Sequence, residues 1–92
     1  MMAAAIFEAV LTAEQARDLA RLMEEGRPTR PAGVITVALL YDGDRGQLIA
    51  IWKSRDALEQ YVSETEVPRG RELMRKVGVE PTMTIVDVLE LG

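Results

Sequence analysis

The segment from Val34 to Lys53 reads VITVALLYDGDRGQLIAIWK, and it predicts a β-hairpin with apolar side chains on both faces. Its two apolar runs flank the turn Asp42–Gly46, whose two glycines and two aspartates are typical of hairpin turns. Because successive strand residues point to opposite faces, the first run divides into Ile35, Val37, Leu39 and Tyr41 against Val34, Thr36, Ala38 and Leu40. An antiparallel sheet with one solvated face alternates apolar and polar residues, and this one does not. We therefore expect both faces of the hairpin to be covered.

A strand and a helix are predicted before the hairpin. The strand covers Ala4 to Leu11, and the helix begins at the N-cap Thr12, with Gln15 three residues later in the position of a capping-box partner. Gly26 is suited to end this helix. The loop from Gly26 to Gly33 then leads into the hairpin.

A second helix and a last strand are predicted after the hairpin. Ser54 is the expected N-cap, Pro68 restarts or kinks the helix, and the helical pattern continues to Gly78. The last strand is predicted over Thr82 to Leu91. The order strand, helix, strand, strand, helix, strand is the α+β, ferredoxin-like βαββαβ pattern. We expect residues 1–92 to form a single domain, a four-stranded antiparallel sheet with two helices on one face.

Two helices cover one face of such a sheet, so its other face is left without cover from this chain. If that face holds about four or five large apolar side chains, each contributes about 1.5–3 kcal/mol when buried. For four of them the sum is roughly 6–12 kcal/mol, which is comparable with the whole stability of a small domain. A homodimer joined through the sheet face by two-fold symmetry would bury it. The alternative is a monomer in which strand twist and the loop Arg27–Gly33 cover the face.

Composition excludes several classes of site. The chain has no cysteine, histidine or asparagine, which rules out disulfides, thiolate metal sites and Ser-His-Asp or Cys-His catalysis. The Asp-rich turn is followed by too few oxygen ligands for a calcium loop, so no metal is expected. A net charge of −4 argues against nucleic-acid binding. The start Met1–Glu8 has no basic n-region, and no apolar run is long enough to span a bilayer, so we expect a cytoplasmic protein without membrane contact.

The segment Ile51–Tyr61, IWKSRDALEQY, resembles the antibiotic biosynthesis monooxygenase-like family of dimeric α+β barrels. Members often end the third strand with a tryptophan followed by a polar residue and a serine, and a helix comes next. The sequel Val67–Gly78 also looks like family members, and the order of elements agrees over nearly the whole chain.

The resemblance implies a dimeric α+β barrel and two known activities. Some relatives are cofactor-free oxygenases that bind a phenolic polyketide or quinol, help to remove a proton and let the substrate anion react with dioxygen. Trp52 matches their tryptophan, whereas the asparagine often cited for them has no counterpart here. Haem-degrading relatives use a histidine that this chain lacks, so neither haem nor another cofactor is expected. The function expected is therefore a cofactor-independent monooxygenase of aromatic or quinol-like molecules, or alternatively a non-catalytic homodimeric ligand-binding or assembly module.

Five side chains are candidates for the site. Trp52 is a candidate for both catalysis and ligand binding, or else a core residue. Tyr61 is a candidate for ligand binding, or else a core residue whose hydroxyl reaches outward. Tyr41 is a candidate for ligand binding or for amphipathic packing, and Thr36 for ligand binding or a locally satisfied hydroxyl. Asp87 interrupts an apolar strand face and is a candidate base if buried, or an edge residue in a salt bridge to an arginine. Without histidine, proton removal would fall to Asp87 or a tyrosine.

Two further observations bear on binding. The basic residues Arg69, Arg71, Arg75 and Lys76 cluster in the later half of the second helix, where a solvated face is the simpler interpretation and an anion site the alternative. A void of roughly a few hundred cubic ångströms beside Trp52 would favour ligand binding, whereas a closed core would favour a structural role.

Overall fold

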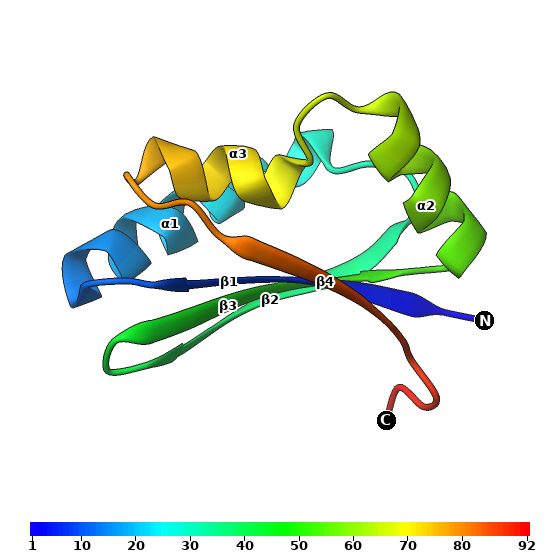
Figure 1. Cartoon of the computed structure of the whole chain (residues 1–92), viewed down its shortest axis with the longest axis horizontal. Coiled ribbons are helices and arrows are strands. Elements are labelled where there is room, and N and C mark those ends of the chain that lie inside the picture. Colours follow the sequence, from blue (N-terminus) through cyan, green and yellow to red (C-terminus); the bar gives the residue numbers. More distant parts are fainter.

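The computed structural model describes residues 1–92 as one antiparallel sheet with helices on a single face (Figure 1). The strand order is β2-β3-β1-β4. This arrangement confirms the predicted α+β, ferredoxin-like class. The elements are β1 Ala3–Val10, α1 Ala13–Glu25, the 3₁₀-helix η1 Arg27–Thr29, β2 Val34–Asp42, β3 Arg45–Trp52, α2 Arg55–Glu64, α3 Arg69–Lys76 and β4 Thr82–Asp87.

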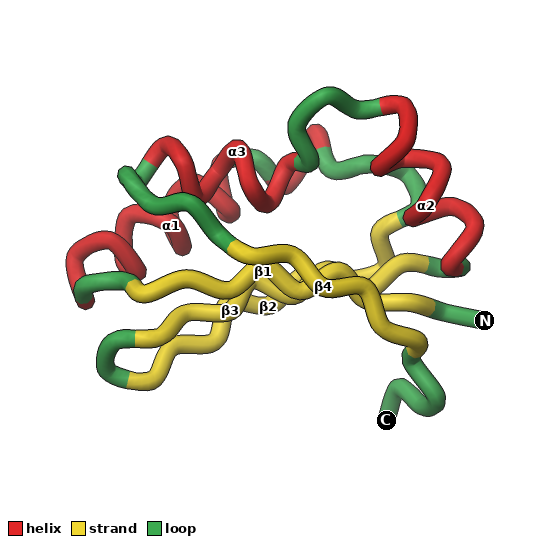
Figure 2. The backbone as a smooth tube through the Cα atoms, in the orientation of Figure 1, coloured by secondary structure: helices red, strands yellow, loops and turns green.

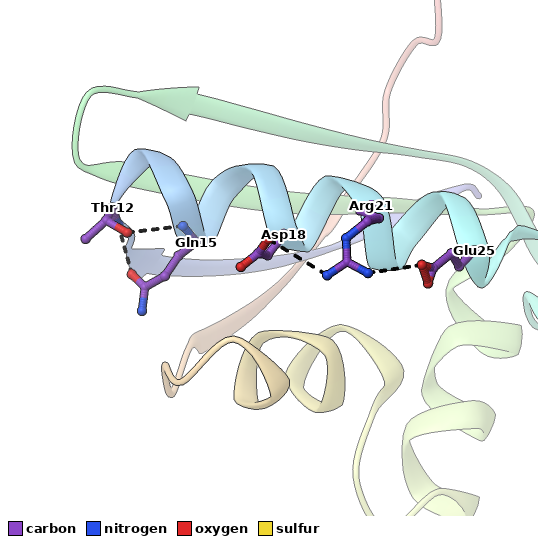
Figure 3. Close-up of polar contacts among 5 residues, drawn as sticks. All are labelled: Thr12, Gln15, Asp18, Arg21 and Glu25. Atoms are coloured by element: carbon purple, nitrogen blue, oxygen red, sulfur yellow. Dashed lines mark hydrogen bonds and ion pairs between the residues drawn. The ribbon is translucent and has the colours of Figure 1, made fainter.

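Helix α1 begins where its capping signal predicts. The Thr12 hydroxyl accepts a hydrogen bond from the Gln15 amide at 3.1 Å, and the Thr12 amide donates to the Gln15 side chain at 2.9 Å (Figure 3). On the solvent side, Arg21 pairs with Asp18 and Glu25 along the helix. Two orphan amides at the helix start are thereby satisfied, and the opposite side of the helix is free to pack on the sheet.

The region predicted as one restarted or kinked helix forms two separate helices, α2 and α3, joined by a loop (Figure 2). Pro68 stands at the N-cap of α3, where its missing N–H costs nothing. Since Pro68 offers no side-chain cap, the Tyr61 hydroxyl accepts the hydrogen bond from the Arg69 amide at 2.9 Å. The break therefore turns α3 over the sheet while a side chain of α2 caps it.

The last strand ends at Asp87, four residues before the predicted Leu91. Strand β4 pairs with β1, and Asp87 lies opposite Ala3, the first residue of β1. One further backbone bond, from Val88 N to Met2 O, closes the ladder. Beyond it β1 offers no further partner, so Leu89 and Leu91 leave the sheet and are exposed.

The face assignment at the start of the hairpin is wrong by one residue. A β-bulge at Ile35 lets Val34 pair opposite Trp52 and Thr36 opposite Ile51. Because the bulge adds a residue to β2, Val34 shares the helix-covered face with Val37, and Ile35 does not. From Thr36 onward the predicted alternation holds.

The sheet face opposite the helices, here called the outer face, carries no helix (Figure 1). Leu40 and Val86 lie on it with 49% and 39% of their surface exposed. The loop before β2 does not cover it, because a Cβ built on Gly33 would lie 2.7 Å from the Trp52 ring, on the helix-covered side. None of the helices is long and apolar enough to cross a bilayer.

Candidate functional site

A cavity of about 60 Å³ lies between the sheet and the helices. Its lining is mostly apolar and comes from every layer of the fold. The sheet supplies Ala5, Phe7, Val34, Val37, Leu48, Ala50, Trp52 and Met83, and the helices and loops supply Met23, Gly26, Arg30, Pro31, Leu58, Tyr61, Val62, Pro68, Arg69, Gly70 and Leu73.

Trp52 forms one wall of this cavity from the end of β3. It is 4% exposed and lies opposite Ala3 on one side and Val34 on the other. Its ring lies 5.0 Å from that of Tyr61, centroid to centroid, with an interplanar angle of 40°. Tilted aromatic pairs at this spacing attract one another beyond their buried area. Trp52 is therefore a core residue and a cavity-lining residue at once.

Tyr61 reaches the same cavity from the inner face of α2. Its hydroxyl caps α3 through the Arg69 amide, so the ring is held at both ends, by Trp52 and by the start of α3. This is the one side-chain hydroxyl among the lining residues, and a phenol both donates and accepts hydrogen bonds.

The structure does not bring the other predicted site residues to this cavity. Tyr41 lies near the hairpin turn, where its hydroxyl bonds to the backbone carbonyls of Leu11, at 3.0 Å, and Gly43. Thr36 is exposed on the outer face, in register with Ile51.

Asp87 lies at the end of β4 and is half-exposed. Its carboxylate accepts a hydrogen bond from Arg55 Nη1 at 3.0 Å, which makes it the salt-bridged edge residue of the simpler interpretation. That hydrogen bond raises the pKa of the Arg55 guanidinium. Asp87 is not among the cavity-lining residues.

Two charged residues, Arg30 and Arg69, line the cavity, and no carboxylate does. Sequence reasoning placed Arg69 in a solvated cluster and did not single out Arg30. That interpretation fits Arg75, which is half-exposed and pairs with Glu80 at 2.6 Å. Arg71 pairs with the same carboxylate at 3.1 Å, but its side chain is only 26% exposed. Arg69 differs because Pro68 starts α3 one residue before it, and the first turn of α3 packs against the loop after α1. The sequence Pro68-Arg69 is the signal that places this arginine at the start of a helix.

The cavity is smaller than the void of a few hundred cubic ångströms that would favour ligand binding outright. A cavity of about 150 Å³ admits a benzene ring, so a ring entering here needs the walls to move. Met23 and Met83 are both in the wall, and unbranched methionine side chains repack readily.

Solved structures with the same fold are found at low sequence identity. One is a monooxygenase from the gene ActVA-Orf6 of Streptomyces coelicolor, in complex with nanaomycin D, with a TM-score of 0.67, 18% identity and coverage of 98% of this chain and 88% of that one. The fold is that of the antibiotic biosynthesis monooxygenase-like proteins. A protein from Bordetella bronchiseptica, named as a candidate member of that class, has a TM-score of 0.66 at 19% identity and covers 97% of this chain and 98% of its own. A protein of unknown function from Nitrosomonas europaea matches with a TM-score of 0.67 at 11% identity and covers 99% of this chain and 92% of its own.

The fold resemblance predicted from Ile51–Tyr61 is thus confirmed by structure. No family model matches the sequence, and no curated protein is similar to it.

Proposed function

We propose that this chain is a homodimeric, cofactor-independent monooxygenase-like protein that acts on small aromatic or quinol-like molecules. The observation that carries the proposal is the aromatic pair Trp52–Tyr61 on the wall of an apolar cavity, in a fold shared with a monooxygenase that binds nanaomycin D. The aromatic walls favour a flat ring, and the apolar lining excludes water from it.

Most of the proposed reaction takes place between the substrate and dioxygen. A bound quinol or anthrone loses a proton, and the resulting anion reacts with dioxygen. For an anthrone, one oxygen atom enters the ring carbon and the other leaves as water, so the substrate supplies all the electrons. The two hydrogens lost by an anthrone end in that water molecule, so the protein has to bind the ring, limit the access of bulk water and stabilise the anion.

Tyr61 is the group we assign to stabilising the substrate anion. The Tyr61 oxygen accepts a hydrogen bond from the Arg69 amide, so its own O–H remains free to donate to the oxygen of the substrate anion. Asp87, the carboxylate considered from the sequence, faces solvent in its ion pair with Arg55, and the proposal does not use it. Trp52 would hold the ring in place.

The homodimer is proposed from the outer face. Its centre, on the inner strands β1 and β3, carries Ile6, Ile49 and Ile51, and the edge strands add Leu40 and Val86. Each such side chain contributes about 1.5–3 kcal/mol on burial. A second copy placed face to face by a two-fold axis offers the same apolar surface in return and closes the two sheets into a barrel-like body.

Oxygen uptake with a panel of quinols and anthrones tests the activity. We expect the wild type to turn over at least one compound, and Tyr61→Phe and Trp52→Phe to lower the rate at least about tenfold. Tyr41→Phe, which removes a hydroxyl outside the cavity, should leave the rate unchanged. If no compound is turned over but one raises the melting temperature of the wild type, the non-catalytic ligand-binding alternative replaces the enzyme. If nothing binds at all, both are wrong.

A further inference from the structure

Two arginines that no carboxylate of the protein neutralises line the cavity. Six of the nine arginines form ion pairs, and the three that do not are Arg17, Arg30 and Arg69. Two of these three line the cavity. The protein has fifteen acidic side chains against eleven basic ones, so carboxylates are not scarce. None of them lines the cavity.

Arg69 is fixed at the cavity wall by the loop after α1. Its Nη1 donates to the Thr29 carbonyl, and its Nη2 donates to the Gly26 carbonyl at 2.7 Å and to the Thr29 hydroxyl at 2.8 Å. Gly26 itself lines the cavity, and a Cβ built on it would overlap Arg69 Nη2. The guanidinium therefore lies against the cavity wall and is held there in a fixed orientation.

The hydrogen bonds satisfy only part of this guanidinium. Arginine carries five N–H donors, and three are used, all on neutral oxygens. Two N–H donors of Arg69 remain without a partner, and no carboxylate neutralises its positive charge. The guanidinium is partly exposed, and an anion brought to it would form a charge-assisted hydrogen-bonded pair. Arg30, on the same loop, adds a second positive charge.

We infer that the cavity takes a small aromatic anion, such as an aryl carboxylate, whose ring lies against Trp52 and Tyr61 and whose charged group pairs with Arg69. Arg30 supports the same charge. This inference rests on the proposed ligand-binding function and narrows the ligand to an acidic class. The size of the cavity limits the first probe to a single ring.

Benzoate and benzamide are nearly equal in size and differ by one charge, so they test the inference directly. Their affinities are measured by amide chemical-shift titration of the intact protein, which also locates the binding site. We expect benzoate to bind at least about tenfold more tightly than benzamide, as a charge-assisted pair implies. The preference should shrink as salt is raised.

Variants separate pairing from a structural role of Arg69. Arg69→Gln should abolish the preference for benzoate, Arg69→Lys should keep part of it, and Arg30→Gln should reduce it. Arg17→Gln, which removes an unpaired arginine outside the cavity, should leave it unchanged. If Arg69 serves only to hold the loop, Arg69→Gln lowers the melting temperature while the ratio of the two affinities stays the same, and the inference is wrong.

The remaining outcomes distinguish this inference from the proposed function. If benzamide or hydroquinone binds in the cavity as tightly as benzoate, the ligand site stands and the acidic ligand class is overturned. If neither benzoate, benzamide nor hydroquinone binds, the ligand site falls and this inference falls with it. Should Arg69→Gln fail to fold, Arg30→Gln and the salt dependence in the wild type still decide the matter.

Discussion

Gly70 shows how closely α3 approaches the sheet. It is buried in the first turn of α3, and a Cβ built on it would overlap the Phe7 ring. Phe7 is itself 3% exposed, so its ring has no free space to move into. The absence of a side chain at Gly70 thus sets the distance between α3 and β1, and with it the depth of the cavity.

We therefore expect Gly70→Ala to destabilise the protein by about 1–3 kcal/mol through overpacking. At a solvent-exposed helical position, glycine to alanine would instead stabilise the protein by about 1 kcal/mol. The sign of the change in stability therefore shows whether Gly70 is in close contact with the sheet. Urea denaturation measures it. Phe7→Leu in the same chain should relieve the contact, so the double variant should lose less than the sum of the two single ones. Additive losses would show that Gly70 and Phe7 do not meet as described.

The position of Arg69 could not be predicted from the sequence around it. The spacing of Arg69, Arg71 and Arg75 describes a basic cluster, and Arg71 and Arg75 do pair with the carboxylate of Glu80. Arg69 instead reaches Gly26 and Thr29, about forty positions earlier in the chain. A contact of that range depends on how α1 and α3 pack, which no local pattern specifies.

At the scale of elements, Glu80 ties α3 to the segment that leads into β4. Its carboxylate pairs with Arg75 at 2.6 Å and Arg71 at 3.1 Å. The hydrogen bond from Arg75 holds the pKa of the Glu80 carboxyl below its usual range. In the window between the lowered pKa and the unfolded value of about 4.3, the unfolded chain binds more protons, so stability rises with pH there.

The stabilisation from Glu80 is accordingly complete above about pH 4.3 and is lost as the pH falls through the lowered pKa. We expect Glu80→Gln to be less stable than the wild type near neutral pH and to converge with it in acid. Thermal unfolding followed from roughly pH 2.5 to roughly pH 7 measures the difference. Glu66→Gln, at an exposed glutamate without an ion pair, should track the wild type throughout. A constant offset between Glu80→Gln and wild type at every pH would contradict the assignment.

Most element boundaries could be predicted from the sequence because they depend on local chemistry. Thr12 with Gln15 fixes the start of α1, and the glycine-aspartate turn fixes the hairpin. The predictions are wrong where pairing between distant segments determines the register or the end of a strand. The bulge at Ile35 is a property of the β2–β3 ladder, and β4 stops at Asp87 because β1 begins at Ala3.

The candidate site divides in the same way. Trp52 and Tyr61 reach the cavity because each follows the periodicity of its own element, and that periodicity is visible in the sequence. Asp87 follows its strand period as well, but it lies at the open end of the sheet, where Arg55 meets it. The periodicity of a strand predicts on which face of the sheet a residue lies, whereas the burial of its side chain depends on how the whole sheet is assembled.

At the scale of the whole molecule, the proposed dimer depends on the outer face. Ile49 lies at its centre on β3, with Ile6 of β1 and Ala38 of β2 on either side. In a monomer, a lysine at position 49 would extend into water at little cost. In a face-to-face dimer the same lysine would place two charges in an apolar interface, which is strongly unfavourable.

We therefore expect the wild type to sediment at low micromolar concentration as a species of twice the 10.2 kDa chain mass, and Ile49→Lys to sediment as a folded 10.2 kDa monomer. Circular dichroism establishes that the variant is folded. Gln60→Lys, which adds the same charge at an exposed position of α2 on the helix-covered side, should remain dimeric. A wild type that sediments as a single chain would mean that the outer face stays in contact with water, and an Ile49→Lys dimer would move the interface to another surface.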